Sequence, residues 1–467
     1  MSGDAATASD RLRASGLGES AVTEWLHAEQ RDTGNYDRDC RGYSQFWGRS
    51  DDLIRRLPPK PARSPAETAA AAAIFAAARE HRERFLRAHA EAVYDRLTRN
   101  RSRFVRLDDL VFEASEAVPG LTPTRPRIAA ESEHLQRDKD GIEIDQGIFL
   151  AHVLGSERAG RHLCHAMLLP HPESAEFLAK LDAEGVVDLG KAAVERSSQA
   201  TLVTMKNPRF LNAEDQTTID ALEIAVDLAI LDPATQIAVL RGGKVDHPKY
   251  NGRRVFGSGI NLTHLYRGQI PYVWFLQRDL GLVHKFLRGV ARPESLPDDV
   301  HGHGIEKPWV AAVEAFAIGG HCQILLTMDY VLAAHDAFMT LPARKEGIIP
   351  GLANLRLPRF TGDRIARQAI QYERKLVCDS PEGRLICDEI APAGDMDGAI
   401  ARVVDGLASS GAVSATANRR ALRIGEEPLD LFRGYCSAYA RDQAYCHFSP
   451  ALIANLERNW DARNRKA

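Results

Sequence analysis

Residues 313–323 place the strongest constraint on how this chain can fold. They read Val-Glu-Ala-Phe-Ala-Ile-Gly-Gly-His-Cys-Gln, an apolar run that ends at Gly319-Gly320 and continues into helix-forming residues. This pattern predicts a strand that turns directly into a helix, and glycine at the turn lets another backbone or a ligand approach closely. Because the first N–H groups of a helix have no intrahelical acceptor, the turn predicts a receptor for a developing negative charge.

The composition is that of an ordinary globular protein and excludes several other classes. The chain has 467 residues, of which 44% are hydrophobic and 26% charged, which predicts two or three domains or one core with large additions. A net charge of −3 gives no general electrostatic case for nucleic acid or anionic lipid. The seven cysteines include no Cys-x-x-Cys pair, which favours free thiols in a reducing compartment. The polar N-terminus and the lack of a long apolar stretch favour a cytoplasmic protein.

The first region, residues 1–198, is predicted to be a helical N-terminal domain. Its clearest helix start is the capping box Ser64-Pro65-Ala66-Glu67, which precedes an alanine-rich run. A further helix is predicted over 174–196, and the polar residues that follow mark a boundary.

The second region, residues 199–420, alternates between strand and helix patterns. Strands are predicted at 200–205, 237–241, 309–318 and 330–334, with helices at 217–230 and at 262–288, the latter broken near Pro271. This alternation predicts an α/β core. The third region, 421–467, is predicted to be a helical segment, and its aromatic stripe of Phe432, Tyr435 and Tyr439 fits a core or a subunit seam better than a ligand site.

Two segments resemble the oxyanion-hole motifs of the crotonase (enoyl-CoA hydratase/isomerase) superfamily. The first is Val-Phe-Gly-Ser-Gly-Ile-Asn-Leu at 255–262, and the second runs from Lys307-Pro308 to Gln323. The Asn-Pro pair at 207–208 and Ile-Pro-Gly-Leu at 349–352 agree with the same family. The resemblance covers about half of the chain, and it implies a crotonase-like core of stacked ββα units, here with a large helical N-terminal domain and C-terminal helices.

The resemblance also implies a shared chemical device. In this family the thioester carbonyl of an acyl-CoA lies between two backbone N–H groups, which stabilise the enolate that forms at the α-carbon. By position these are the N–H groups of Ile260 and Gly320. One such donor typically lowers a barrier by about 3–4 kcal/mol.

The chain departs from the hydratases of the family at both catalytic glutamates. Gln323 occupies the position of one and Ala343 the position of the other. Neither an amide nor a methyl group can exchange a proton as a carboxylate does, so hydration of a double bond is disfavoured. A second departure is the insert at 244–255, and a third is the helical N-terminal half.

These departures resemble one branch of the family, the cofactor-independent dioxygenases that act on 3,5-dihydroxyphenylacetyl-CoA in dihydroxyphenylglycine formation for glycopeptide antibiotics. The resemblance implies an oxidoreductase that uses O2 to form 3,5-dihydroxyphenylglyoxylate and CoA. It implies no cofactor and no metal, and the pair His301 and His303 has no third ligand at a recognised spacing. A dry pocket would be needed, because water would quench the carbanion.

The candidate site residues follow from these motifs. The catalytic candidates are Ile260, Gly320, Gln323 and His247, the last being the best proton acceptor by residue type. Glu214, His247 and Arg278 are expected to contact the ring hydroxyls or to help in proton transfer. The remaining candidates are expected to bind the acyl-CoA substrate: Pro208, Arg209, Pro248, Lys249, Tyr250, Ser258, Gly259, Asn261, Leu262, Thr263 and Gly319.

Two other functions stay open from the sequence alone. The chain could be another crotonase enzyme, such as a hydratase, isomerase or thioesterase, or a non-catalytic acyl-CoA-binding scaffold. The family resemblance further implies a homohexamer built as a dimer of trimers, with an arylacetyl-CoA and O2 as partners and without nucleic acid or membrane.

Overall fold

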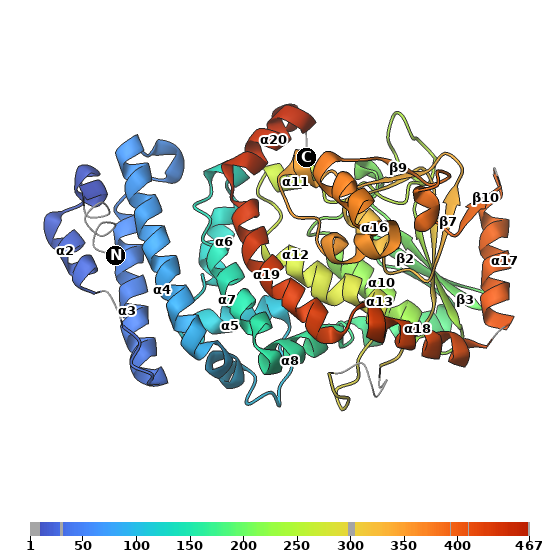
Figure 1. Ribbon diagram of the computed structural model, residues 1–467, viewed down its shortest axis with the longest axis horizontal. Coiled ribbons are helices and arrows are strands. Elements are labelled where there is room, and N and C mark those ends of the chain that lie inside the picture. Colours follow the sequence, from blue (N-terminus) through green and yellow to red (C-terminus); the bar gives the residue numbers. More distant parts are fainter. Residues whose placement is uncertain (1–9, 29–30, 298–303, 393, 410, 466–467) are drawn as a thin grey trace. The chain divides into compact units, whose positions relative to one another are not determined.

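The structure is a computed structural model that describes residues 10–28, 31–297, 304–392, 394–409 and 411–465 (Figure 1). The chain forms two compact units. One comprises Met1–Leu163 with Cys436–Phe448, and the other comprises Cys164–Tyr435 with Ser449–Ala467. No helix among the described residues combines the length and apolarity needed to cross a membrane.

The first unit is built from helices. In chain order they are α2 (Glu19–His27), α3 (Tyr36–Arg55), α4 (Pro65–Leu97), α5 (Leu107–Ala117), α6 (Arg125–Ser132), α7 (Ile144–Gly155) and α8 (Glu157–Leu168). The last residues of α8, from Cys164 on, belong to the second unit. The predicted capping box is confirmed, since the Ser64 hydroxyl accepts from the Glu67 N–H and the Glu67 carboxylate accepts from the Ser64 N–H. Helix α4 packs against α3 and α7, and its core includes the fully buried Phe85.

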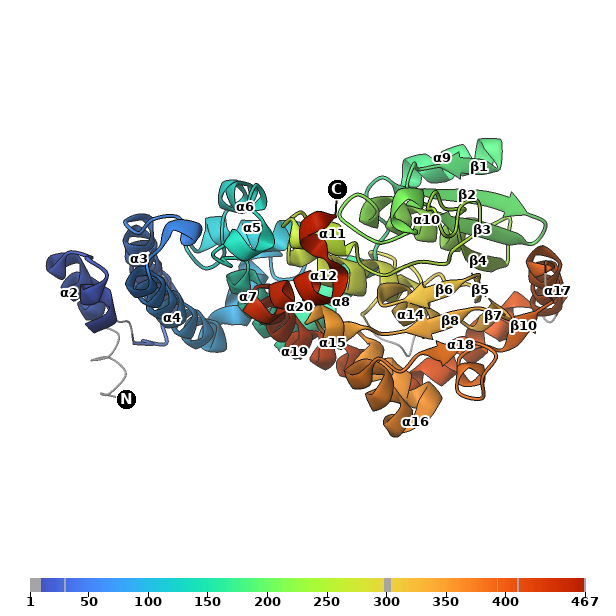
Figure 2. The same ribbon diagram turned by 90° about the horizontal axis from the view of Figure 1, so that it is seen from above.

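The second unit contains a seven-stranded sheet, whose order is β1-β2-β3-β4-β5-β7-β10 (Figure 2). The strands are β1 (Val186–Asp188), β2 (Ala192–Ser197), β3 (Ala200–Met205), β4 (Ile237–Gly242), β5 (Trp309–Val313), β7 (Tyr330–Ala334) and β10 (Glu389–Ala391). From β3 to β10 all neighbours are parallel, whereas β1, β2 and β3 pair antiparallel. The predicted strands at 200–205, 237–241 and 330–334 are therefore confirmed.

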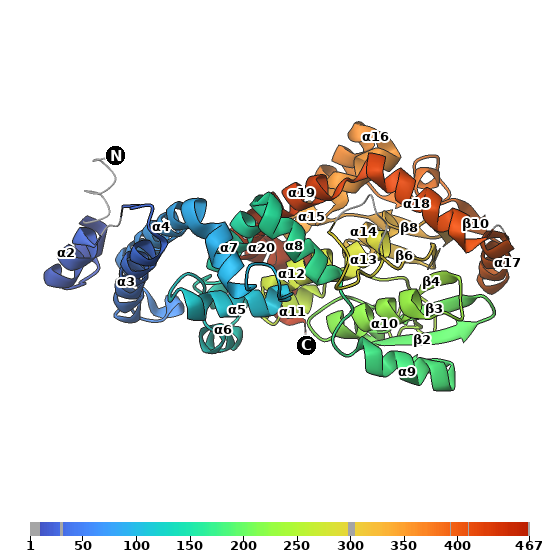
Figure 3. The same ribbon diagram turned by 90° about the horizontal axis from the view of Figure 1, so that it is seen from below.

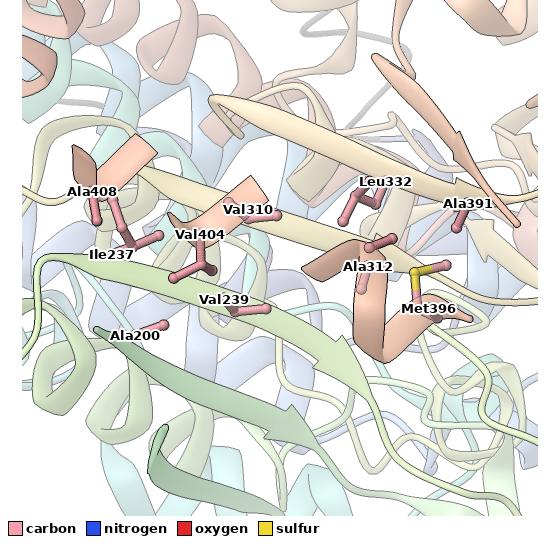
Figure 4. Close-up of a cluster of buried hydrophobic side chains, with 11 residues drawn as sticks. Ala200, Ile237, Val239, Val310, Ala312, Leu332, Ala391, Met396, Val404 and Ala408 are labelled. Carbon is pink, nitrogen blue, oxygen red and sulfur yellow. The ribbon is translucent and has the colours of Figure 1, made fainter. Parts of the chain in front are cut away.

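Helix α17 (Met396–Ser409) covers part of one face of this sheet. Figure 4 shows alternate side chains of β4 and β5, among them Val239 and Val310, pointing toward Met396 and Val404. All of these side chains are buried, so the cluster follows from the period-two pattern of the strands meeting one face of a helix.

The helix predicted over 174–196 is wrong in its second half. Helix α9 (Ser174–Glu184) ends at Gly185, which has a φ of 72° and caps the helix in the left-handed region. The chain then returns as β1 and β2, which join the edge of the sheet. Strand pairing thus outweighed local helix propensity, and residues before the predicted boundary at 198 belong to the sheet.

The single strand predicted over 309–318 is also wrong, because two strands of different sheets occupy it. Strand β5 ends at Val313, Ala315 adopts a φ of 66°, and β6 (Phe316–Ile318) continues in a smaller sheet of order β6-β8-β9. Its partners are β8 (Phe338–Thr340) and β9 (Leu376–Val377). Arg241 holds the Glu314 carboxylate through Nε at 2.7 Å, which fixes the chain at this bend.

The helix predicted over 262–288 forms in four pieces with the expected break near Pro271. They are α11 (Leu262–Tyr266), α12 (Val273–Gln277), a π-helical segment (Arg278–Val283) and α13 (His284–Arg288). Helix α10 (Ile219–Leu231), also predicted, packs against the π-helical segment and α13. The remaining helices of this unit are α14 (Gly320–Leu325), α15 (Ala343–Glu346), α16 (Ala353–Tyr372), α18 (Ala412–Glu426) and α20 (Pro450–Trp460), while α19 (Leu429–His447) contributes residues to both units.

A buried ion triad joins α13 to α10. The ammonium group of Lys285 lies 2.7 Å from a carboxylate oxygen of Glu223 and 2.7 Å from one of Asp227, and all three side chains are fully buried. Asp227 also accepts from the Ser174 hydroxyl at 2.8 Å. These contacts anchor the helical segment that carries Arg278.

Replacing Lys285 by Met should strongly destabilise the protein, since two buried carboxylates would lose their cation. The expected loss is about 3–5 kcal/mol in the free energy of unfolding, measured by urea titration. Lys206→Met is the control, because Lys206 pairs with the exposed Asp188 at the surface, and its loss should cost less than about 1 kcal/mol. Equal losses in the two variants would contradict the structural role of the triad.

Candidate functional site

The two glycine-containing segments predicted to form one site do lie side by side. Gly257 pairs with Ala317, and the N–H of Ile318 donates to the Gly257 carbonyl at 3.0 Å. Gly259 has a φ of 80°, and a Cβ atom at this position would lie 2.9 Å from the Ile318 carbonyl oxygen and 3.4 Å from the Gly320 nitrogen. Glycine at 259 is therefore required both by backbone conformation and by the close approach of the second segment.

The N–H groups of Ile260 and Gly320 are both available to a ligand. Around Ile260, the Glu214 N–H donates to the Gly259 carbonyl and the Asn261 N–H donates to the Glu214 carbonyl, each at 2.8 Å. Gly320 is the first residue of α14, and this helix is labelled in Figure 3. Across the part of the chain that the structure describes, neither N–H donates to a protein acceptor. Two unused donors at adjoining segments have the chemistry of an anion receptor.

A buried guanidinium group organises the polar side of this site. Arg278 is 3% exposed, and its Nε donates to Glu214 Oε1 at 2.8 Å. Its Nη2 donates to the Gly320 carbonyl at 2.7 Å. Its Nη1 donates to the carboxylate of Asp279 and to the amide oxygen of Gln323, both at 2.9 Å. The predicted residues Glu214, Arg278, Gly320 and Gln323 thus form one cluster.

The charges of this cluster follow from burial and from Arg278. Burial alone would raise the pKa of Glu214, but the guanidinium of Arg278 reverses the shift and holds this pKa below its usual value. Burial lowers the pKa of His321 to about 4, so the imidazole is neutral near pH 7. Its Nδ1 accepts from the Gly259 N–H at 3.0 Å, so the proton of the neutral ring lies on Nε2.

One oxygen of Glu214 remains open for a ligand donor. Oε2 is buried and has no hydrogen-bond partner among the described residues. A Cβ atom on Gly320 would lie only 2.2 Å from it, so this oxygen directly faces the backbone of the Gly319-Gly320 turn. The arrangement places an ionised acceptor beside two free N–H donors.

The carboxamide of Gln323 has a defined orientation. Because Arg278 carries only donors, the atom of Gln323 that faces it must be the oxygen. Its Nε2 group makes no hydrogen bond with any residue in the described ranges. Gln323 therefore offers N–H donors, and no proton acceptor, to whatever lies beyond it.

The insert forms a short hairpin that the structure does not link to this cluster. The Val245 N–H donates to the Arg253 carbonyl at 3.0 Å, and the ring of Tyr250 packs edge-on against Phe316 at 5.3 Å. His247 is half-buried, and its Nδ1 accepts from the Lys249 N–H at 3.3 Å. No hydrogen bond among the described residues joins His247 to the Arg278 cluster. Pro248 and Lys249 are exposed.

The other predicted binding residues border the site through backbone and structural contacts. Pro208 and Arg209 are exposed in the turn after β3, where the Asp246 N–H donates to the Pro208 carbonyl at 3.1 Å. The Asn261 side chain caps α11 and donates to Asp215 at 2.9 Å, so its amide is engaged within the protein. Ser258, Leu262, Thr263 and Gly319 lie in the two glycine-containing segments and at the start of α11, and Ser258 donates to the Phe210 carbonyl at 3.0 Å.

Two functional candidates were missed from the sequence. Asp279 is 1% exposed, and burial raises its pKa to about 6 against the opposing effect of Arg278. His321 supports the Gly259 turn. The sequence did offer a reason to select Asp279, since it is a second charged residue next to Arg278 in a largely apolar helix. It offered none for His321, whose role depends on a contact between residues 62 positions apart.

Ala343 is buried at the first turn of α15, so no carboxylate stands at that position. Glu346, on the same short helix, has a pKa raised to about 7 by burial and by Glu373. Among the described residues, no hydrogen bond or ion pair joins it to the Arg278 cluster. Within the described ranges, no group of three or more His, Cys, Asp and Glu side chains could hold a metal ion. His301 and His303 lie outside these ranges.

Replacing Gly320 by Ala should disrupt the cluster, because the new methyl group would meet Glu214 Oε2 and also Arg278 Nη2, which lies 2.9 Å from that position. Overpacking of this kind should lower the free energy of unfolding by about 1–3 kcal/mol. Gly425→Ala is the control, since a Cβ atom added at this residue of α18 would have no atom within 4 Å. The control should leave stability unchanged or raise it by up to about 1 kcal/mol.

The low pKa of His321 should make stability depend on pH. An unfolded chain takes up the proton near pH 6.5, whereas the folded protein does so only near pH 4. The free energy of unfolding is therefore unaffected by this proton above pH 6.5. It should fall by about 3 kcal/mol as the pH falls to 4, because the unfolded chain binds the proton first. His321→Asn retains an acceptor for Gly259 and does not titrate, so urea titrations from pH 4 to 7 should show a shallower fall. Parallel curves for the two proteins would contradict the assignment.

Comparisons with known proteins identify the family that the chain resembles. The Enoyl-CoA hydratase/isomerase family profile matches residues 294–428. The (3,5-dihydroxyphenyl)acetyl-CoA 1,2-dioxygenase of Amycolatopsis orientalis is 47% identical over 419 residues, which cover 90% of this chain and 95% of that protein. A crotonyl-CoA hydratase of Syntrophomonas wolfei is 26% identical over 38% of this chain and 60% of its own length.

A solved structure gives a further match. An enoyl-CoA hydratase from Mycobacterium avium subsp. paratuberculosis is 20% identical, with a TM-score of 0.48 over 60% of this chain and 99% of its own.

Proposed function

We propose that this chain, which belongs to the enoyl-CoA hydratase/isomerase family, is a dioxygenase that converts 3,5-dihydroxyphenylacetyl-CoA and O2 into 3,5-dihydroxyphenylglyoxylate and CoA. The similarity to the Amycolatopsis orientalis dioxygenase over nearly the whole of both chains carries this proposal. A match over 419 of 467 residues necessarily includes most of the helical N-terminal half. The free N–H groups of Ile260 and Gly320 provide the chemistry that the reaction requires.

The reaction begins with an enolate. The thioester oxygen binds between the N–H groups of Ile260 and Gly320, and each donor stabilises the developing charge by about 3–4 kcal/mol. The aryl ring and the carbonyl both acidify the α-proton. The resulting carbanion passes one electron to O2, and recombination forms a bond between the α-carbon and oxygen.

The remaining steps balance without another reactant. The α-peroxide attacks the thioester carbonyl and expels CoA as its thiolate, which closes a four-membered cyclic peroxide. Loss of the second α-proton then breaks the O–O bond and gives the α-keto acid. Both oxygen atoms of O2 enter the product, and the two α-hydrogens leave as protons.

The side chains of the cluster have distinct proposed roles. Glu214, whose Oε2 is free among the described residues, accepts a hydrogen bond from a ring hydroxyl or helps to move a proton, and Arg278 holds its charge. Gln323 donates a hydrogen bond near the α-carbon. His247 remains a candidate proton acceptor by residue type, reached through the insert. The residues proposed to border the CoA moiety are Pro208, Arg209, Ser258, Gly259, Asn261 and Thr263.

Two alternatives make different use of the same site. Hydration is opposed by Gln323 and by the buried Ala343, because neither can activate water. A non-catalytic acyl-CoA-binding scaffold would have no need for two free N–H donors or for a buried, charge-balanced cluster.

An assay of the purified protein after treatment with a chelator tests the proposal. With 3,5-dihydroxyphenylacetyl-CoA, O2 uptake and thiol release should proceed in equal amounts, followed by an oxygen electrode and a thiol reagent. Thiol release without O2 uptake would instead identify a thioesterase. Absence of both, together with no exchange of the α-proton in D2O, would favour the scaffold.

We further infer that the protein forms a homohexamer, built as a dimer of trimers. We also infer that it is located in the cytoplasm and takes part in antibiotic biosynthesis. Large exposed apolar side chains on the helical surface of the second unit, such as Tyr372, Leu422 and Ile424, support association between copies. Sedimentation of the purified protein at micromolar concentration tests the assembly, and a monomer would contradict it.

A further inference from the structure

One nitrogen atom of the cluster serves two acceptors. Nη1 of Arg278 carries two protons; it donates to Oδ1 of Asp279 at 2.9 Å and to Oε1 of Gln323 at 2.9 Å. Asp279 and Gln323 come from different elements, the π-helical segment and α14. The two side chains are therefore coupled through a single donor group.

Because the guanidinium group is planar, the acceptors on some of its N–H groups fix the directions of the others. Glu214 accepts from Nε and the Gly320 carbonyl accepts from Nη2, so the plane is fixed along one side. Asp279 fixes the opposite corner, which leaves the second proton of Nη1 aimed at Gln323. Without this carboxylate, Nη1 could tilt, and the carboxamide of Gln323 would lose the contact that sets which end faces the ligand.

Asp279 lies in a π-helical turn. Within residues 278–283 the backbone hydrogen bonds join residues five positions apart, whereas those of an α-helix join residues four apart. Such π-helical turns are often found at functional sites. The carboxylate of Asp279 contacts the guanidinium of the adjacent Arg278 at 2.9 Å.

We propose that Asp279 is a positioning residue, which acts through Nη1 of Arg278 to hold Gln323 with its amide N–H groups directed into the site. The inference rests on the proposed function for its kinetic consequences only. The order of contacts is Asp279, Arg278, Gln323 and then the substrate.

The charges that face Asp279 are those of Arg278 on its own segment, Arg356 on α16 and Glu214 in the loop before α10. The neutral His321 of α14 lies beyond Glu214. Burial raises the pKa of Asp279 to about 6, so its carboxylate is ionised above this pH and protonated below it. Turnover should therefore weaken as pH falls through about 6, because the bond from Nη1 to a neutral acid is weaker than the bond to a carboxylate.

Asp279→Asn tests the proposal, because it removes the charge and keeps the shape. Its kcat should fall about tenfold or more at pH 8, as expected for loss of a charge-assisted hydrogen bond, with KM changed less than twofold. The decline below pH 6 should disappear from its pH profile. Asp232→Asn is the matched control, since Asp232 is a buried partner of Arg196 in the loop before β4, and its kcat should stay within twofold of the wild type.

A double-mutant cycle distinguishes positioning from a general structural effect. If Asp279 acts through Gln323, then Asp279→Asn should change kcat less than twofold in a Gln323→Ala background. A full tenfold loss in that background, or an unchanged kcat in the single variant, would overturn the proposal.

Crystal structures of the wild type and of Asp279→Asn provide a readout that needs no turnover. The proposal expects the Gln323 carboxamide to rotate away from Nη1 in the variant, while the Glu214–Arg278 contact remains. An unmoved carboxamide would overturn the inference even in an active enzyme. An inactive wild type with a rotated variant carboxamide would instead reject the proposed function and leave the positioning role intact.

Discussion

The close approach of two backbone segments is the constraint on which the rest of the site depends. Gly259 must take a left-handed conformation and leave room for Ile318 and Gly320, and only a residue without a Cβ atom satisfies both conditions. This approach brings two N–H groups, from residues 60 positions apart, to one place. The seven-stranded sheet, the bend at Ala315 and the start of α14 hold the two segments together.

Arg278 is the second feature that fixes the geometry of the site. Its guanidinium contacts a loop, a π-helical segment and the Gly319-Gly320 turn, and its charge is balanced by the buried carboxylates of Glu214 and Asp279. A buried charge of this kind is costly unless it is paired and hydrogen-bonded, and here its donors have acceptors of fixed position. The cluster therefore rigidifies the site in which an enolate would form. The Lys285 triad anchors α13, which continues the π-helical segment that carries Arg278.

Much of the fold could be predicted because local patterns and long-range pairing agreed. The capping box at Ser64, the buried strands β3, β4 and β7 and the break near Pro271 all have local causes. The pattern failed where tertiary contacts opposed it. Residues 186–197 became strands because the sheet edge offered partners, and 309–318 divided because Glu314 is tied to Arg241. The π-helical segment has no sequence signal and was not predicted.

The sequence by itself determined which atoms the site can offer. The glycine pair, the glutamine at 323 and the alanine at 343 are covalent facts, and they specify two backbone donors, an amide and no pair of water-activating carboxylates. Only the tertiary structure decided how those atoms are used. It placed Glu214, Arg278 and Gln323 within hydrogen-bonding distance of one another through Arg278. It also added Asp279 and His321 to the site, whereas His247 lies outside the hydrogen-bonded cluster. The physical reason is that hydrogen-bond partners and buried charges are set by distances between segments, which a linear pattern does not contain.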